Sequence, residues 1–210
     1  MRLYYADIRG LDESRSLYPP LSKSKGSAFG TSLLSAAYME YTRRKLPLVE
    51  KLFGGKPYFP EKPGLHFSLS HSRTHVFCAL SEYPIGVDTI DFRGIDPHVI
   101  ERLTTPEERE QLTFYEIWAL RESLFKLENE GKLRTMRFYK LNGEIIPPIE
   151  GVRCRLYDDI PESASAVSIR QGEFPERLIE IPSKKLLRKD SLQTVKPAFS
   201  HSEAKILPDH

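Results

Sequence analysis

The fold is decided by a segment of the second half of the chain, which reads Trp118-Ala119-Leu120-Arg121-Glu122-Ser123-Leu124-Phe125-Lys126. At about 100° per residue in a helix, its aliphatic residues form one narrow stripe, which predicts the face that packs on the core. These residues are Ile117, Leu120, Leu124 and Leu127. A second stripe, with a spacing of four residues, carries Trp118, Glu122 and Lys126. An ordinary i, i+4 ion pair explains Glu122 and Lys126 alone, but a tryptophan beside them favours the wall of a cleft.

The helix around this segment is predicted to begin at a capping box. Thr105 provides the N-cap, Pro106 the first helical position and Glu108 the third. We expect this helix to run without a break to about Asn129, with Gly131 ending it.

Strand-like runs and one earlier helical pattern surround this helix. Strands are predicted at 2–8, 66–70, 75–81, 85–90, 151–157, 164–170 and 178–181, and a helix at 27–50. Residues 11–26 are expected to be a loop, and the last three strands an antiparallel sheet. The order strand, long helix, strands occurs once in each half, which is compatible with two similar lobes. We therefore expect lobes at 1–82 and 83–183 and a loosely held tail at 184–210.

The composition is that of an ordinary globular protein. The 210 residues include 31 Lys and Arg against 29 Asp and Glu, so bulk charge gives no reason to expect a nucleic-acid partner. Cys78 and Cys154 lie in strand-like runs and are expected to be small buried hydrophobes. The N-terminus does not have the pattern of a signal peptide, and no apolar run has the length of a membrane span. A cytoplasmic, soluble protein is expected.

A Ser70-His71-Ser72 turn follows the strand that begins at His66. A surface histidine in a turn explains His71 taken alone. A Ser-His-Asp hydrolase is excluded, because the Gly-x-Ser-x-Gly nucleophile elbow is absent.

The segment Ile85-Gly86-Val87-Asp88 predicts a buried strand that carries a carboxylate. Such a carboxylate needs a cation or several hydrogen-bond donors, because its burial without them is costly. The alternative is an aspartate that only caps the end of the strand. Gly86 permits another segment or a ligand to approach closely.

These segments, in this order, resemble the surfactin-type 4'-phosphopantetheinyl transferases. That family has an aromatic-x-x-Ser-His-Ser turn, a Gly-Val/Ile-Asp strand and a helix with Trp-x-x-Lys-Glu-Ser/Ala-x-x-Lys. The counterparts here are Phe67 to Ser72, Gly86 to Asp88, and Trp118 to Lys126, and Gly55-Lys56-Pro57 is a fourth match. The resemblance spans roughly residues 27–170.

The resemblance implies an α+β fold in which two similar lobes form a pseudo-dimer within one chain, with coenzyme A in the cleft between them. It also implies Mg²⁺-dependent transfer of 4'-phosphopantetheine from coenzyme A to a serine of an apo acyl or peptidyl carrier protein, with release of 3',5'-ADP. The carrier would serve fatty-acid, polyketide or nonribosomal-peptide synthesis. We expect a monomer with neither nucleic acid nor a membrane as partner.

The site residues also follow from the resemblance. Asp88 and Glu122 would hold the Mg²⁺ or Mn²⁺ ion, and Glu122 would also accept the serine proton. Lys126 would neutralise pyrophosphate charge and help the leaving group.

The remaining matches would bind coenzyme A. Ser70 and His71 would contact the phosphate end of the nucleotide, and Lys56 the adenosine region. Lys23 and Lys25 are weaker candidates for the 3'-phosphate, because their loop aligns poorly.

The sequence departs from the family pattern at three places. Ile90 stands where many members have a third acidic ligand, and Asp91, one residue later, should point to the opposite face of the strand from Asp88. Arg121 replaces the usual Lys, and an arginine cannot act as a base. Only Gly131 remains of a common Gly-x-Gly. These departures leave open a relative that binds coenzyme A or a carrier protein without turnover.

Overall fold

The structure is a computed structural model, and it describes residues 1–19, 26–51, 55–188 and 199–200. The elements of the first half are β1 (Arg2–Asp7), the 3-10 helix η1 (Glu13–Arg15), α1 (Ser27–Thr42), β2 (Val49–Lys51), β3 (Pro57–Tyr58), β4 (His66–His71) and β5 (His75–Ser81). Those of the second half are β6 (Ile85–Asp91), α2 (Pro97–Leu103), α3 (Pro106–Arg109), α4 (Phe114–Glu128), η2 (Leu133–Thr135), β7 (Tyr139–Leu141), β8 (Glu144–Ile146), β9 (Arg153–Tyr157), β10 (Ser163–Ile169), β11 (Ile179–Glu180), η3 (Ser183–Leu186) and β12 (Phe199–Ser200).

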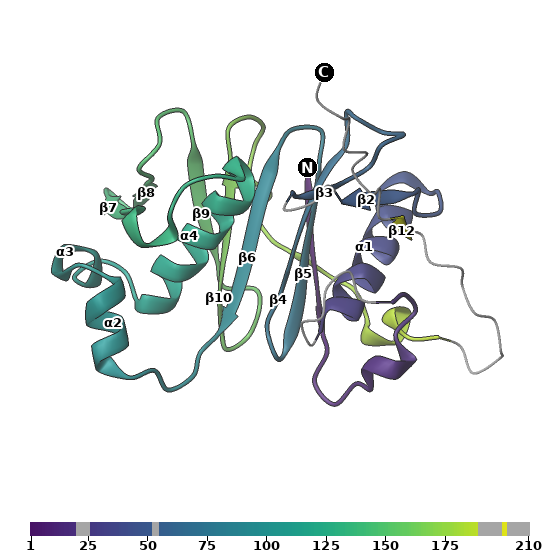
Figure 1. Cartoon of the computed structure of the whole chain (residues 1–210), viewed down its shortest axis with the longest axis horizontal. Coiled ribbons are helices and arrows are strands. Elements are labelled where there is room, and N and C mark those ends of the chain that lie inside the picture. The colour runs from purple at the N-terminus through teal and green to yellow at the C-terminus, as the bar shows by residue number, and fades with distance from the viewer. Residues whose placement is uncertain (20–25, 52–54, 189–198, 201–210) are drawn as a thin grey trace, which may run out of the picture.

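The fold is α+β, as predicted, and its two main sheets lie between the two long helices (Figure 1). The first sheet has the strand order β11-β1-β5-β4, and the second has the order β6-β10-β9-β8-β7. A small third sheet has the order β12-β2-β3. Helix α1 covers the outer face of the first sheet, and α4 covers the outer face of the second.

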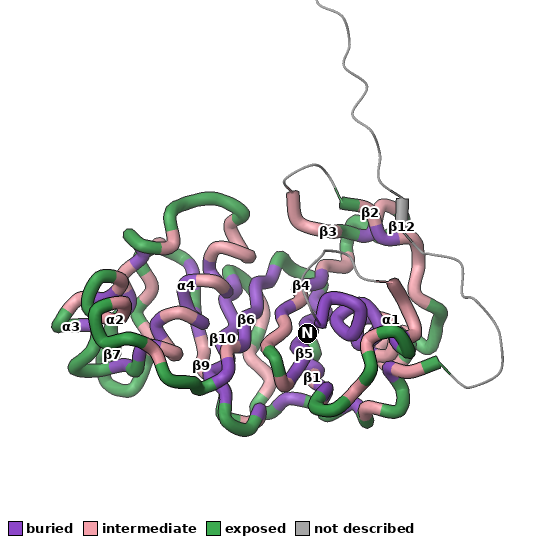
Figure 2. The backbone as a smooth tube through the Cα atoms, turned by 60° about the horizontal axis from the view of Figure 1, so that its bottom comes forward, coloured by how far each residue is buried: buried purple, intermediate pink, exposed green. Residues whose placement is uncertain are grey.

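Strand alternation explains how each sheet can be covered on both faces. On β5, Val76 and Cys78 face α1, whereas Phe77 and Ala79 join a third cluster that contains Val87 of β6. The two inner faces therefore pack directly on each other. Figure 2 shows the resulting concentration of buried residues along the central strands and α1.

The sheets also meet along β4 and β6, through serine hydroxyls. Ser68 Oγ accepts a hydrogen bond from the backbone N–H of Val87 (3.1 Å), and Ser70 Oγ accepts one from that of Thr89 (3.2 Å). Side chains of β4 thus satisfy buried backbone donors of β6, which would be costly to leave unpaired.

The long helix of the second half is interrupted, contrary to expectation. The predicted capping box at Thr105 and Glu108 is confirmed, but the helix that it begins, α3, ends at Arg109. A second capping box, formed by Thr113 and Glu116, starts α4. Helix α4 ends at Glu128, close to the predicted end, and its C-cap is Asn129 in the left-handed conformation (φ 57°), so Gly131 is not the residue that ends it.

The strand predicted at 75–81 is confirmed with the same bounds. The other predicted elements are found with shifted ends, and one strand has a different partner. Helix α1 ends at Thr42, where Arg43 is left-handed, and not at residue 50. The strand predicted at 178–181 is β11, but it pairs in parallel with β1 of the first sheet and not with β9 or β10. Helix α2, strands β2 and β3 and the β7–β8 hairpin were not predicted. The turn residues of this hairpin, Asn142 and Gly143, both have positive φ.

The chain after β11 returns to the first half. Leu186 of η3 is fully buried in the cluster around α1, and Arg188 donates to the carbonyl oxygens of Arg15 and Ser16. The segment expected as a tail thus begins within this packing, while 189–198 and 201–210 lie outside the described residues. Cys78 and Cys154 are buried, as predicted. Within the described part of the chain, no helix combines the length and the hydropathy of a membrane span.

Candidate active site

Asp88 is the point at which β4, β6 and α4 meet. Its side chain is buried, and the residue is 7% exposed. Its Oδ1 accepts hydrogen bonds from Ser70 Oγ of β4 (2.6 Å) and from Lys126 Nζ of α4 (2.7 Å). The carboxylate therefore has both the cation and the donor that its buried position requires.

Gly86 permits α4 to come this close to β6. A Cβ atom at this position would lie 1.9 Å from the backbone oxygen of Ser123 and 2.6 Å from the backbone nitrogen of Leu127. Only a glycine fits, because the obstacle is the helix backbone and not a flexible side chain. The same contact brings the stripe of Glu122 and Lys126 over Asp88.

Glu122 lies half-buried one helical turn before Lys126. Burial raises the pKa of its carboxyl group, the charge of Asp88 raises it further, and Lys126 opposes both effects. Two carboxyl groups thus lie in each other's electrostatic field in a partly desolvated place. A divalent cation bound between the two carboxylates would offset their mutual repulsion and so stabilise the folded protein.

Asp88 and Glu122 offer too few ligands to bind a metal ion without further ligands from water or substrate. Within the described segments, no group of three or more His, Cys, Asp and Glu has an arrangement that could hold a metal ion. Mg²⁺ commonly binds through one or two carboxylates together with water and substrate phosphates. Asp88 and Glu122 therefore fit a Mg²⁺ ion that a phosphate substrate helps to bind.

Lys126 and a second lysine, Lys56, lie close to each other near the start of β6. Lys56 Nζ donates a hydrogen bond to the backbone oxygen of Ile85, and burial together with Lys126 lowers the pKa of Lys56 to about 8. Lys56 and Lys126 line the same cavity of about 220 Å³. Two cations around so small a space favour an anionic ligand.

His71 lies at the end of β4 and lines a larger cavity of about 630 Å³, together with Gly26 and Ile90. Burial lowers the pKa of His71, and the charge of Lys126 lowers it further. Ser70, next to it, is turned toward the second sheet, where its hydroxyl serves Asp88 and Thr89.

The structure places the remaining candidates away from this group or does not describe them. Lys23 and Lys25 lie outside the described residues. Trp118 is half-buried and stacks on Phe114, with ring centroids 6.0 Å apart. Arg121 points into the protein, where it forms a fully buried ion pair with Glu108.

Asp91 is bound on the other side of β6, by the turn between β4 and β5 and by Ser163 of β10. No role was predicted for Asp91 from the sequence, nor for Thr74 and His75, which belong to the same network. The hydrophilic turn 71–74 gave no signal that its partner would be a carboxylate of the next strand.

Comparisons with known proteins agree with the motifs. No family model matches the chain. It is 32% identical over 100 residues to "4'-phosphopantetheinyl transferase psf-1" of Bacillus pumilus, which covers 41% of this chain and 43% of that protein. It is 26% identical over 151 residues to "4'-phosphopantetheinyl transferase Sfp" of Bacillus subtilis (strain 168), and 29% over 153 residues to "4'-phosphopantetheinyl transferase ffp" of Bacillus subtilis. Each of these two alignments covers 63% of this chain and 67% of the relative. The alignments thus span between 36% and 67% of the length of the curated relatives that the chain matches.

Proposed function

Because the chain belongs to the family of surfactin-type 4'-phosphopantetheinyl transferases, we propose that it transfers the 4'-phosphopantetheine group of coenzyme A to a serine of an apo carrier protein. In this reaction the serine oxygen forms a bond with the β-phosphorus of the pyrophosphate. The bond from that phosphorus to the leaving oxygen breaks, and 3',5'-ADP is released.

One observation carries the proposal: Asp88 Oδ1 lies 2.7 Å from Lys126 Nζ, in a place where Glu122 shares the field of Asp88. Phosphoryl transfer depends mainly on positioning and on charge neutralisation. Asp88 and Glu122 supply carboxylates that can position a metal ion. Lys126 and Lys56, which line one cavity, supply positive charge that can neutralise the pyrophosphate.

Asp88 and Glu122 would hold the Mg²⁺ ion, which, when bound with the pyrophosphate, neutralises part of its charge. Lys126 would bind the pyrophosphate and stabilise the charge on the leaving ADP. Glu122 would accept the proton of the serine hydroxyl, directly or through water, and its raised pKa suits that role.

Coenzyme A would lie along the joint between two lobes that form a pseudo-dimer. His71 and Ser70 would contact its phosphate end and Lys56 its adenosine region, with Lys23 and Lys25 as further candidates for the 3'-phosphate. The cavity of about 220 Å³ is lined by Lys56, Lys126 and residues 67–69 of β4, and that of about 630 Å³ by His71 and residues 89–91 of β6. In this proposal the enzyme acts as a cytoplasmic monomer, with neither nucleic acid nor membrane among its partners.

Mass spectrometry of apo carrier proteins tests the proposal. Incubation with coenzyme A and Mg²⁺ should add one phosphopantetheine group to at least one acyl or peptidyl carrier in a panel of fatty-acid, polyketide and nonribosomal-peptide origin. Asp88→Asn and Glu122→Gln should abolish the mass shift, whereas Asp96→Asn, at an exposed cap of α2, should not.

A panel without any mass shift, alongside a known transferase that modifies the same carriers, would refute the transfer. Calorimetry would then distinguish a relative that only binds coenzyme A from an unrelated protein. Arg121 does not favour the alternative of a relative that only binds coenzyme A, because its side chain donates to Glu108 and does not point into the site.

A further inference from the structure

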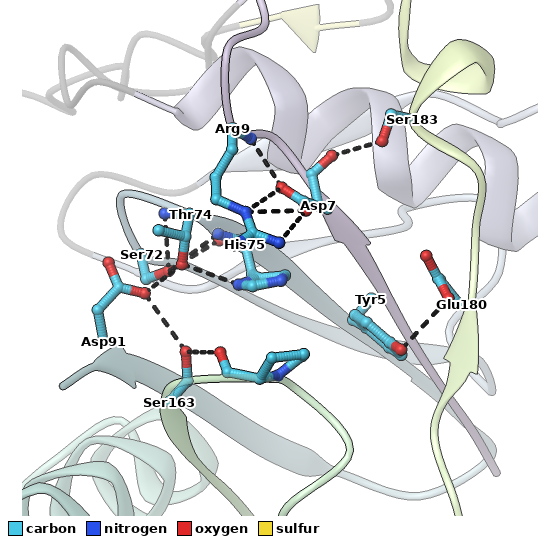
Figure 3. Close-up of polar contacts among 11 residues, drawn as sticks. Tyr5, Asp7, Arg9, Ser72, Thr74, His75, Asp91, Ser163, Glu180 and Ser183 are labelled. Carbon is cyan, nitrogen blue, oxygen red and sulfur yellow. Dashed lines mark hydrogen bonds and ion pairs between the residues drawn. The ribbon is translucent and has the colours of Figure 1, made fainter.

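Asp91, the last residue of β6, connects the two sheets and lines the larger cavity. It is 6% exposed, and Figure 3 shows it between the β4–β5 turn and Ser163. Its Oδ2 accepts from the backbone N–H of Arg73 (2.9 Å). Its Oδ1 accepts from the hydroxyl of Thr74 (2.5 Å) and from that of Ser163 (3.3 Å).

The turn itself is closed by its own residues. The backbone N–H of Ser72 donates to the carbonyl oxygen of His75 (2.8 Å). Ser72 Oγ accepts from the backbone N–H groups of Thr74 (3.2 Å) and His75 (3.0 Å). Within residues 72–75, only the N–H of Arg73 has its acceptor outside the turn, and that acceptor is Asp91. The carbonyl oxygen of Thr74 also accepts from the backbone N–H of Ile8 (2.8 Å), at the end of β1 in the first sheet. Asp91 therefore binds this turn to β6 of the second sheet.

Thr74 extends this connection to a buried histidine. Because its hydroxyl hydrogen is donated to Asp91, its oxygen accepts from Nδ1 of His75, 2.8 Å away. His75 is 2% exposed. The hydrogen bonds thus run in one direction, from the Nδ1–H of His75 to Thr74 and from the hydroxyl of Thr74 to Asp91. This order favours one orientation of the Thr74 side chain.

The exposed side chain of Arg73 adds little to the connection. Its Nε lies 3.7 Å from Asp91 Oδ2, and the side chain is 70% exposed. Ion pairs of this kind contribute little to stability. The connection depends on the backbone of Arg73 and the hydroxyl of Thr74.

The position of the turn determines the shape of the larger cavity. Two adjoining walls include His71, Ser72 and Arg73 of the turn region and Thr89, Ile90 and Asp91 of β6. The other carboxylate that connects β4 to β6, Asp88, is shared with Lys126 and, in the proposed function, with the metal ion. Asp91 is the carboxylate that remains for holding the walls together.

We propose that Asp91 is a positioning residue for coenzyme A: it holds the turn that carries His71 at a fixed distance from β6 and so keeps the cavity ready for the ligand. This role rests on the proposed function. It acts on binding of coenzyme A, because the groups assigned to the transfer step, Asp88, Glu122 and Lys126, lie on the other side of β6.

Thr74→Val and Thr74→Ser form the matched pair that tests this role. Valine has nearly the shape of threonine but removes the hydroxyl, whereas serine keeps it. We expect Thr74→Val and Asp91→Asn to raise the Kd for coenzyme A by about tenfold, and Thr74→Ser and Asp96→Asn to change it by less than about twofold, since small displacements of binding groups are costly. The kcat at saturating coenzyme A should stay within about twofold in all four variants.

Amide exchange and NMR shifts distinguish the positioning role from a purely structural role of Thr74 and Asp91. Amide exchange at Arg73 and the NMR shifts of the His71 ring should change in Thr74→Val and not in Thr74→Ser, in protein without ligand. A lower Tm in Thr74→Val and Asp91→Asn with unchanged Kd and unchanged His71 shifts would overturn the positioning role.

If the wild type binds coenzyme A but modifies no carrier, the proposed transfer fails and the positioning role is still decided by the Kd values. If the wild type does not bind coenzyme A, both proposals are refuted.

Discussion

Nη2 of Arg121 lies 2.9 Å from both carboxylate oxygens of Glu108, and both side chains are fully buried. Glu108 also accepts from the backbone N–H of Phe138, and Arg121 donates to the carbonyl oxygen of Leu103. The pair therefore joins α4, the helix that carries Glu122, to α3, to the end of α2 and to the segment after η2.

Glu108→Gln should lower the free energy of unfolding by about 3–5 kcal/mol, because it leaves the guanidinium of Arg121 buried without its counter-charge. Urea denaturation measures this loss. The double variant Glu108→Leu/Arg121→Met should recover most of the stability, because it buries no charge. A double variant as unstable as Glu108→Gln would show that the two side chains do not act as a pair.

Gly86→Ala should lower the stability by about 1–3 kcal/mol, as expected for overpacking in a rigid core. The added methyl group meets the backbone of α4, so the helix must move and take Lys126 away from Asp88. Thermal unfolding and the transfer assay would both show the change. Gly94→Ala is the matched control, since a Cβ there meets nothing within 4 Å, and it should alter neither.

Glu122→Gln should raise the Tm in the absence of metal while abolishing transfer. The folded protein raises the pKa of Glu122 above its ordinary value of 4.5, so the ionised carboxylate destabilises the fold at neutral pH. The gain should therefore be present near pH 7 and disappear as the pH falls below about 4.5, where both states are protonated. Melting curves at pH 7.5 and pH 4 measure it, and an equal gain at both pH values would contradict this cause.

Mg²⁺ should raise the Tm of the wild type and of Asp96→Asn, but not that of Asp88→Asn or Glu122→Gln. The reason is that binding to the folded state alone stabilises it by mass action. A Tm shift that persists in both carboxylate variants would place the ion elsewhere.

Binding of coenzyme A should weaken as the pH rises through about 8. Lys56 has a pKa of about 8 because it is buried near Lys126, so it is cationic below that pH and neutral above it. Titration calorimetry between pH 7 and pH 9 follows the change. Lys56→Met should bind more weakly at pH 7 and lose most of this pH dependence, whereas Lys62→Met, at an exposed position, should keep it.

The local patterns of the sequence predicted most elements that position the site. The alternation in β4, β5 and β6 and the aliphatic stripe of α4 were sufficient, because each of these elements buries one clear set of residues. The break before α4 was missed although Thr113 and Glu116 repeat the capping-box pattern. The reason is that residues 110–112 contain no glycine or proline to interrupt the helical reading.

Contacts between distant segments could not be read from periodicity. The bond between Asp88 and Lys126 joins residues on a strand and a helix, and only the resemblance to a family placed them in one site. The pairing of Glu108 with Arg121 was hidden because the capping box already explained Glu108. The parallel pairing of β11 with β1 joins the two ends of the described fold, and no local pattern specifies it.

That pairing has a consequence for synthesis on the ribosome. β1 is translated long before β11, and one of its two edges stays without a partner until β11 has been made. This edge of β1 therefore remains unpaired while nearly all of the second half is translated. A fragment that stops at residue 82 would keep the edge open permanently, so we expect it to aggregate where the full chain folds.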